Sequence, residues 1–129
     1  MNVFKMGKIQ MKRYQIIVPS LDTDEVIITS ERIDHIRAHH PGDFDAYRAW
    51  IPEILENPEY ILEDRKHPHD TAILLKSFPV DNEILYFHLC LHLHTPESPL
   101  EYQNSIITFW RIHQKEYERL IKNRKHYES

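Results

Sequence analysis

The chain has 129 residues, of which 41% are hydrophobic and 28% charged, and its formal net charge is −4. This length and composition predict a single folded domain, residues 1–129, and exclude a disordered chain. No apolar run approaches the roughly 20 residues of a membrane-spanning helix, and the first residues lack the apolar core of a secretory signal. Cys90 is the single cysteine, so we expect a protein of the reducing cytoplasm with no membrane partner.

The first elements expected along the chain are two short strands and a helix. Residues 13–19 and 25–29 are β-branched runs, each of which predicts a strand, and residues 1–13 are interpreted as a flexible basic extension. Thr29 or Ser30 offers an N-cap to the residues that follow. A helix is therefore predicted over Glu31–His40, ended by the Pro-Gly pair that comes next.

The remaining elements complete an α+β pattern. Residues 43–58 predict a second helical segment, which Pro52 should kink or split. Strands are predicted over residues 59–64, 71–78, 83–95 and 104–112, and a basic helix over residues 113–128. Short connections favour antiparallel pairing. We therefore expect two N-terminal helical segments, a four-stranded antiparallel sheet covered on one face by helices, and a C-terminal basic helix.

The predicted helix over Glu31–His40 carries a polar flank. Arg32, His35 and His39 lie on one side of it at helical spacing, and the two histidines are four residues apart, so both imidazoles reach one point. That spacing suits a base with its partner or a metal. The metalloprotease pattern needs a glutamate directly after the first histidine, which is absent, and the adjacent arginine favours an anionic substrate. A structural pair of histidines at a helix end is the alternative.

Strand alternation over residues 83–95 separates an apolar face from a polar face. One face consists of leucines and Phe87, and it is expected to be core. The other face carries Tyr86, His88, Cys90, His92 and His94. These histidines indicate an open cleft, a solvated face, or a metal site of the H-x-H kind. We expect no metal and no other cofactor, because a third ligand is not evident in the sequence.

The other candidate residues lie on the two neighbouring strands and the last helix. Lys76 stands alone on an apolar strand face, either as a device against edge aggregation or as a cation for a phosphate. Thr108 and Trp110 are expected on one face of the last strand with Ile106, and Ser105 and Arg111 on the other. A hydroxyl beside an indole suits a nucleotide stacked on the ring. The last helix presents cations for a polyanion: Lys115, Arg119 and Lys122.

Four segments together resemble the phage-associated nucleases of the barnase–EndoU–colicin–RelE (BECR) superfamily. They are "ITSERIDHIRAHHP", "ILENPEYILED", "TAILLKSF" and "NSIITFWRI" with the basic helix that follows. The resemblance implies a metal-independent ribonuclease, toxin-like, with an immunity or antitoxin protein as a partner. By position it implies His35 or His39 as the helix histidine, Lys76 as the strand lysine, and Thr108 as the hydroxyl, with Ser105 as the alternative.

The hypothesis is an endoribonuclease that cleaves RNA, with tRNA as one substrate, through attack of the 2′-hydroxyl on the adjacent phosphate. His35 or His39, Lys76 and Thr108 are expected to converge on one cleft as catalytic residues. Substrate binding is assigned to Arg32, Tyr86, His88, His92, Ser105, Trp110, Arg111, Lys115, Arg119 and Lys122. The alternatives are a non-catalytic RNA- or protein-binding module of a phage or mobile element, and a metal hydrolase using His88, His92 and His94.

Overall fold

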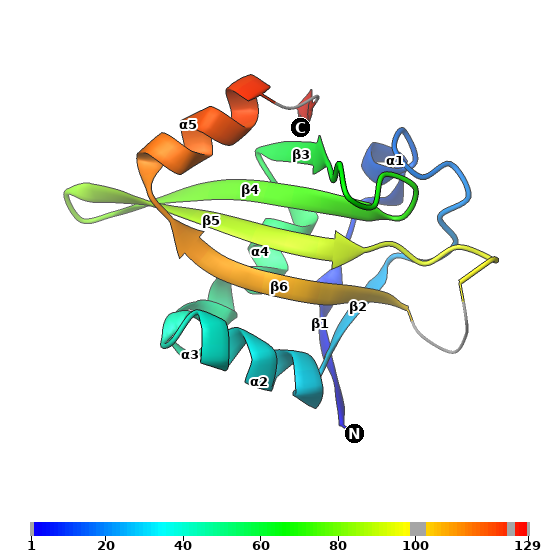
Figure 1. Cartoon of the computed structure of the whole chain (residues 1–129), viewed down its shortest axis with the longest axis horizontal. Coiled ribbons are helices and arrows are strands. Elements are labelled where there is room, and N and C mark those ends of the chain that lie inside the picture. The colour runs from blue at the N-terminus through cyan, green and yellow to red at the C-terminus, as the bar shows by residue number, and fades with distance from the viewer. Residues whose placement is uncertain (1, 99–102, 124–125, 129) are drawn as a thin grey trace.

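A computed structural model describes residues 2–98, 103–123 and 126–128 (Figure 1). Within these ranges the chain forms one mixed β-sheet with helices packed against it. In chain order the elements are β1 (Val3–Lys8), α1 (Met11–Tyr14), β2 (Glu25–Thr29), α2 (Ser30–His39), α3 (Asp43–Tyr47), a 3-10 turn (Arg48–Trp50), α4 (Ile51–Glu56), β3 (Tyr60–Glu63), β4 (Thr71–Val80), β5 (Glu83–His92), β6 (Asn104–Ile112), α5 (Gln114–Asn123) and β7 (His126–Glu128).

The sheet confirms the α+β class but is larger than expected. Its strand order is β1-β2-β6-β5-β4-β3-β7, and β3, β4, β5 and β6 form the predicted antiparallel core. β2 joins this core through a short parallel ladder with β6, in which Val26 pairs with Asn104 and Ile27 with Ser105. The four-stranded antiparallel sheet was therefore incomplete, because β1, β2 and β7 extend it at both edges.

The predicted N-cap of the first helix and the predicted break at Pro52 in the second helical segment are both confirmed. α2 begins where the N-cap was expected: the backbone N–H of Arg32 donates to the Thr29 hydroxyl at 3.2 Å. Pro52 splits the second segment, as predicted, since α4 starts afresh with proline in its first turn after the 3-10 turn. Among the described residues, no helix is long and apolar enough to cross a membrane.

Three predictions near the chain ends are wrong. The segment 13–19 is not a strand, because Tyr14 ends α1, is fully buried, and donates its hydroxyl to the Leu55 carbonyl at 3.1 Å. The expected flexible extension is wrong for residues 3–13, since β1 pairs with β2 and buries Met6, and α1 follows from Met11. The last helix ends at Asn123, and β7 follows it and pairs with β3. Tertiary packing overrides the local pattern at both ends.

The sheet carries a large core on one face and a small core on the other. Helices α1 to α4 cover the first face, and α5 covers part of the second (Figure 1). Phe87 lies at the centre of the large core, where its ring stacks on Phe109 with centroids 5.6 Å apart. The small core is formed by residues of β3 to β6 with α5: Leu62, Ile73, Leu75, Cys90, Ile112 and Leu120. We call the second face the open face.

A β-bulge in β6 changes which of its side chains share a face. The register shifts between Cys90, which pairs with Thr108, and Leu91, which pairs with Ile106. The extra residue, Ile107, reverses the alternation on its N-terminal side. Ser105 therefore shares the open face with Thr108, whereas Ile106 belongs to the helix-covered core. The prediction that Ile106 shares a face with Thr108 and Ser105 with Phe109 is wrong for this reason.

Candidate functional site

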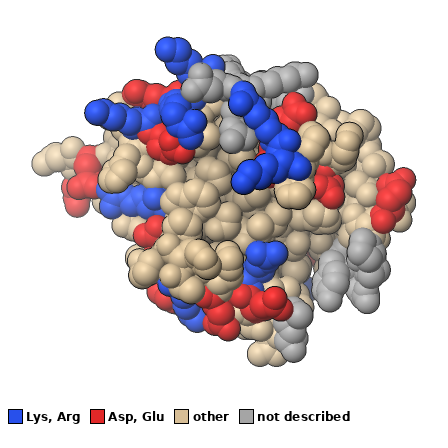
Figure 2. All heavy atoms as spheres, viewed as in Figure 1, with Lys and Arg blue, Asp and Glu red and all other residues tan. Residues whose placement is uncertain are grey.

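The open face of β5 has the predicted polar character. Leu89 and Leu91 are buried against the helices, which confirms the apolar face, and the imidazoles of His88 and His92 lie on the other side. α5 covers the Tyr86 end, where the Tyr86 and Tyr117 rings lie 4.7 Å apart. In Figure 2, most of the charged side chains visible on this side lie around its margin, and the centre is formed by other residues. The centre of this side is therefore largely uncharged.

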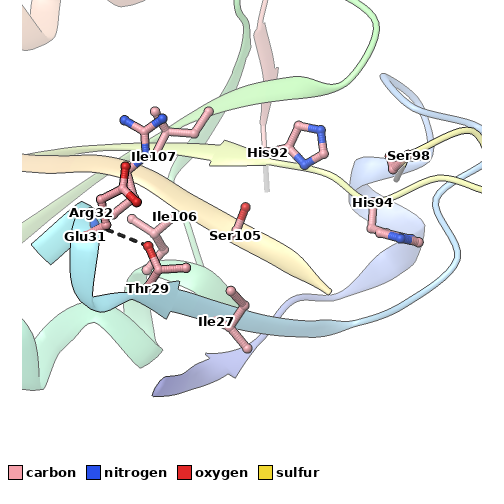
Figure 3. A pocket seen from close by; sticks show the side chains of 10 residues that line it. All are labelled: Ile27, Thr29, Glu31, Arg32, His92, His94, Ser98, Ser105, Ile106 and Ile107. Atoms are coloured by element: carbon pink, nitrogen blue, oxygen red, sulfur yellow. Dashed lines mark hydrogen bonds between the residues drawn. The ribbon is translucent and has the colours of Figure 1, made fainter. Parts of the chain in front are cut away.

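A pocket of about 410 Å³ opens at the end of this face, between β2, β6, the end of β5 and the start of α2 (Figure 3). Ile27, Ile106 and Ile107 supply apolar lining, and polar groups from separate elements surround them. His92 and Ser105 rise from neighbouring strands on the same side, because they are register partners. The polar lining residues are Thr29, Glu31, Arg32, His92, His94, Ser98 and Ser105.

Each of the two pocket histidines has a carboxylate beside it. His94 Nδ1 lies 2.7 Å from Asp22 Oδ1, and His92 Nε2 lies 3.4 Å from Asp70 Oδ2. A carboxylate beside an imidazole fixes the orientation of the ring, which is the arrangement that acid–base catalysis requires. Asp22 and Asp70 were missed in the sequence, because both come from irregular segments distant along the chain. Their only sequence signal is an acidic residue flanking a predicted strand.

The start of α2 brings a positive charge to the pocket. Thr29 caps the helix, and Arg32, in its first turn, lines the pocket from the side opposite His92. The unpaired N–H groups of a helix N-terminus add a partial positive charge at the same place. Glu31 also lines the pocket and is exposed, so it partly offsets this field. The arrangement suits a single phosphate held between Arg32 and the imidazoles.

The helix histidines lie further along the same flank of α2. His35 and His39 are exposed, their rings stack with centroids 4.2 Å apart, and His39 Nδ1 lies 3.0 Å from the His35 carbonyl oxygen. Arg32 shares this flank by helical spacing. The opposite flank carries Arg37, which pairs with Asp45 of α3 at 2.7 Å. His35 and His39 therefore face the side that carries the pocket, although neither lines it.

One family model matches residues 5–89, and its description is phage-Barnase-EndoU-ColicinE5/D-RelE like nuclease3. This match covers well over half of the chain. The chain belongs to this nuclease family. The resemblance seen in the sequence is thereby confirmed, and no curated protein or solved structure matches the chain. The nuclease match includes most of β1, all of β2 to β4 and α2, and most of β5, and it ends before His92, His94 and Ser105.

Trp110 of the nuclease is held between two imidazoles. Its ring stacks on His40 at 4.4 Å with an interplanar angle of 4°, and on His88 at 4.1 Å with an angle of 25°. His88 comes from β5 on one side of β6, and His40 comes from the end of α2 on the other. Both ring faces are thus occupied, so this structure does not support the predicted stacking of a base on Trp110. Its role here is to hold α2 against β6.

The stacked His40 should make the stability of the nuclease depend on pH. Burial lowers the pKa of His40, Asp43 opposes this shift, and the nearby His39 and His35 reinforce it. The unfolded state then binds the proton more readily, so the free energy of unfolding should fall as the pH drops below about 6.5. Comparing denaturant midpoints at about pH 7.5 and about pH 5, we expect His40→Phe to show a smaller loss than the wild type.

The exposed His67 supplies the matched control for this measurement. His67→Phe should keep the full pH dependence of the wild type. An equal pH dependence in His40→Phe and in the wild type would contradict the assignment to His40.

Lys76 lies on the wrong face for the predicted cleft. It pairs with Phe87 on the helix-covered face, whereas Thr108 pairs with Cys90 on the open face. Its Nζ donates to the Asn57 carbonyl at 2.7 Å and lies 3.6 Å from Glu53 Oε2, so it stabilises the C-terminal end of α4. The predicted convergence of Lys76 and Thr108 on one phosphate is therefore wrong, because the sheet separates them.

We expect Lys76→Met to reduce stability and leave catalysis intact. The substitution removes a charge-assisted hydrogen bond from a mostly buried side chain, so the free energy of unfolding should fall by about 1–2 kcal/mol. The exposed Lys66→Met serves as the control and should change stability little. Denaturant titration and kcat of the folded protein check this. If Lys76→Met loses activity while its stability is unchanged, Lys76 takes part in the reaction and the prediction is wrong.

The remaining predicted binding residues lie away from the pocket. Arg111 is on the helix-covered side, where its backbone N–H donates to Asp43 and its guanidinium lies 3.4 Å from Glu83. Tyr86 and Arg111 line a separate pocket at the opposite end of β5. On α5, Lys115 and Lys122 are exposed, and Arg119 pairs with Glu116 at 2.7 Å. The predicted binding set therefore divides between the two ends of the sheet.

A metal centre on the histidine face has no set of ligands within the described part of the chain. No group of three or more His, Cys, Asp or Glu side chains there is close enough to hold a metal ion. His92 and His94 are instead each beside one aspartate.

Proposed function

We propose that this nuclease is a metal-independent endoribonuclease whose reaction takes place in the pocket between α2, β5 and β6. The observation that carries the proposal is the pocket itself. It combines two carboxylate-paired imidazoles, His92 and His94, with the cation Arg32 and the hydroxyls of Thr29 and Ser105. These are the groups that in-line cleavage of a ribose phosphodiester requires.

In the proposed reaction the 2′-oxygen of a ribose attacks its own 3′-phosphate. One histidine accepts the 2′-hydroxyl proton while the new O–P bond forms, and the other donates a proton to the departing 5′-oxygen as its bond to phosphorus breaks. The products are a 2′,3′-cyclic phosphate and a 5′-hydroxyl. His92 is the last residue of β5 and His94 follows beyond the strand, and both line the pocket in which the phosphate would bind.

The other pocket residues would stabilise the charge that develops on the phosphate. Arg32 would pair with its non-bridging oxygens, and the Thr29 hydroxyl, whose oxygen already accepts the Arg32 N–H, retains its proton to donate. Ser105, opposite His92 on β6, would add a second hydroxyl donor. Arg32 thereby supplies charge that a metal ion provides in other nucleases. Acid–base assistance from one histidine would contribute about 10²–10⁴-fold.

Binding of the rest of the RNA would use cations further from the pocket. Lys115 and Lys122 are exposed on α5, which lies on the same face of the sheet as the pocket (Figure 1). The net charge of −4 does not oppose such contacts, because a phosphate responds to charges within about 10 Å at cellular salt.

The test is cleavage of total RNA in EDTA, followed by analysis of the product ends. We expect cleavage to persist and to give cyclic phosphate and 5′-hydroxyl ends, and a substrate with a single 2′-deoxy residue at the cut site to resist. Activity that requires added zinc or manganese, or products with 5′-phosphate ends, would contradict the proposed mechanism. RNA binding without any cleavage would favour the binding-module alternative.

A further inference from the structure

One row of register partners crosses the sheet through the pocket. Lys5 on β1 pairs with Ile27 on β2. Ile27 pairs in turn with Ser105 on β6, and Ser105 pairs with His92 on β5. Register partners point to the same face of a sheet, so the four side chains belong to the open face. Three of them line the pocket, and Lys5 is the next residue of the row, on the outermost strand beyond β2.

The neighbours of Lys5 along β1 confirm the face to which it belongs. Met6 is buried in the large core under the helices, and Phe4 pairs with Ile28 of the same core. Side chains alternate along a strand, so Lys5, which lies between them, points to the open face. Lys5 is exposed, and among the described residues its ammonium forms no ion pair, either with Glu31 of the pocket or with another carboxylate.

The two ends of this row carry opposite charges. At the end away from Lys5, His92 Nε2 lies 3.4 Å from Asp70 Oδ2. A second cavity of about 360 Å³ shares His92 with the pocket, and its lining includes the carboxylates of Asp70 and Glu97. Cations attract a phosphate and carboxylates repel it within about 10 Å at cellular salt. A strand with one phosphate in the pocket is therefore expected to place an adjacent phosphate on the β1 side.

Strand spacing puts Lys5 within reach of that adjacent phosphate. Neighbouring strands lie about 4.7–4.9 Å apart, so the backbone of Lys5 is roughly 10 Å from that of Ser105. The ammonium is carried on a flexible stem, which shortens the span. Resting on the proposed function, we infer that Lys5 binds the phosphate next to the one that is cleaved. The substrate is then an RNA strand with at least two successive phosphodiesters, laid across β2 with Ile27 under the nucleoside between them.

Lysine on an edge strand has another known use, which is to prevent pairing with a second chain. Lys8 supplies the control for this use, because it is an exposed lysine of the same strand. Its register partner is the carboxylate Glu25 instead of a pocket residue. Loss of general positive charge or of edge protection should affect Lys8→Met and Lys5→Met alike, whereas loss of a phosphate site should affect only Lys5→Met.

The first measurement compares kcat/KM for short RNA substrates of different length. The shortest is a dinucleoside monophosphate of the mapped cut site, which has a single phosphodiester, and the others carry one more nucleotide on the 5′ or the 3′ side. We expect one of the two extensions to raise kcat/KM in the wild type and in Lys8→Met. Lys5→Met should lose roughly 3–10-fold on that extended substrate and nothing on the shortest one, and Lys5→Arg should keep the gain. An equal loss on both substrates, or an equal loss in Lys8→Met, would overturn the inference.

The second measurement is binding, which does not depend on cleavage. The probe is an uncleavable 2′-deoxy strand of roughly six nucleotides, titrated at several salt concentrations. Each phosphate contact to a single strand contributes about 0.7 to the slope of log affinity against log salt, so Lys5→Met should lower the slope by about that amount and Lys8→Met should not. An unchanged slope in Lys5→Met, or a wild type that does not bind the strand, would overturn the inference. If the wild type binds but does not cleave RNA, the proposed function fails, and the slope still decides whether Lys5 contacts a phosphate.

Discussion

His92→Ala is expected to lower kcat for RNA cleavage by about 10²–10⁴-fold, the usual contribution of a general acid or base. His92 lines the pocket beside Asp70 and opposite Ser105, and its side chain is 30% exposed. Its removal should therefore change stability little. The exposed His67→Ala is the control and should retain full activity. Wild-type kcat in folded His92→Ala would exclude His92 from the reaction.

The same variant separates the two histidine roles. If His94 accepts the 2′-hydroxyl proton in the proposed reaction, His92 is the residue that protonates the departing 5′-oxygen. A substrate whose 5′-oxygen is replaced by sulfur has a leaving group that needs no proton, so His92→Ala should cleave it almost as fast as the wild type does. His94→Gln should remain slow on both substrates. If instead His94→Gln cleaves the sulfur substrate at the wild-type rate and His92→Ala does not, the two histidines exchange roles. The pocket would still be the site of the reaction.

The largest loss of stability is expected for Phe87→Ala. Phe87 is fully buried and contacts four aromatic rings, with centroid distances of 4.9 Å to Tyr47, 5.6 Å to Trp50 and to Phe109, and 5.8 Å to Phe78. A Phe→Ala change in such a core costs about 3–5 kcal/mol. This is a large fraction of the roughly 5–15 kcal/mol that holds a domain folded, and should lower Tm by roughly 10–20 °C.

Phe4→Ala is the matched control, because Phe4 on β1 is 39% exposed. It should cost well under half as much as Phe87→Ala in the same denaturant titration. Equal losses would mean that the core is not centred on Phe87. The kcat of the Phe87→Ala fraction that remains folded should be near that of the wild type, since Phe87 does not line the pocket.

The elements that the sequence predicted well are those set by local chemistry. Thr29 caps α2 and Pro52 starts α4, because a cap and a proline act within one turn of their own position. The leucine face of β5 follows from strict alternation in a strand. In contrast, β1 and the turn after Tyr14 depend on packing between distant segments, and nothing in the local sequence specifies that packing.

The candidate site was predictable only in part, for two physical reasons. Alternation correctly grouped Lys76 with Leu74, and Thr108 with Trp110, but it does not say which face of one strand continues a face of the next. That depends on register. The bulge at Ile107 adds a second uncertainty, because one extra residue turns Ser105 to the other side. Carboxylates in irregular segments, such as Asp22, follow no period at all.

In the described structure β2 and β6 are joined by two register pairs, and this joining decides when the pocket forms during synthesis of the chain. Arg32 is synthesised well before Ser105, and the two meet in one pocket only after β6 has docked between β2 and β5. Domains fold as units during synthesis, and contacts this distant along the chain form late. A growing chain on the ribosome would therefore contain the entire matched segment, residues 5–89, and still lack the pocket. On the proposed function, the ribosome, itself built of RNA, would be exposed to a completed site only after β6 has emerged.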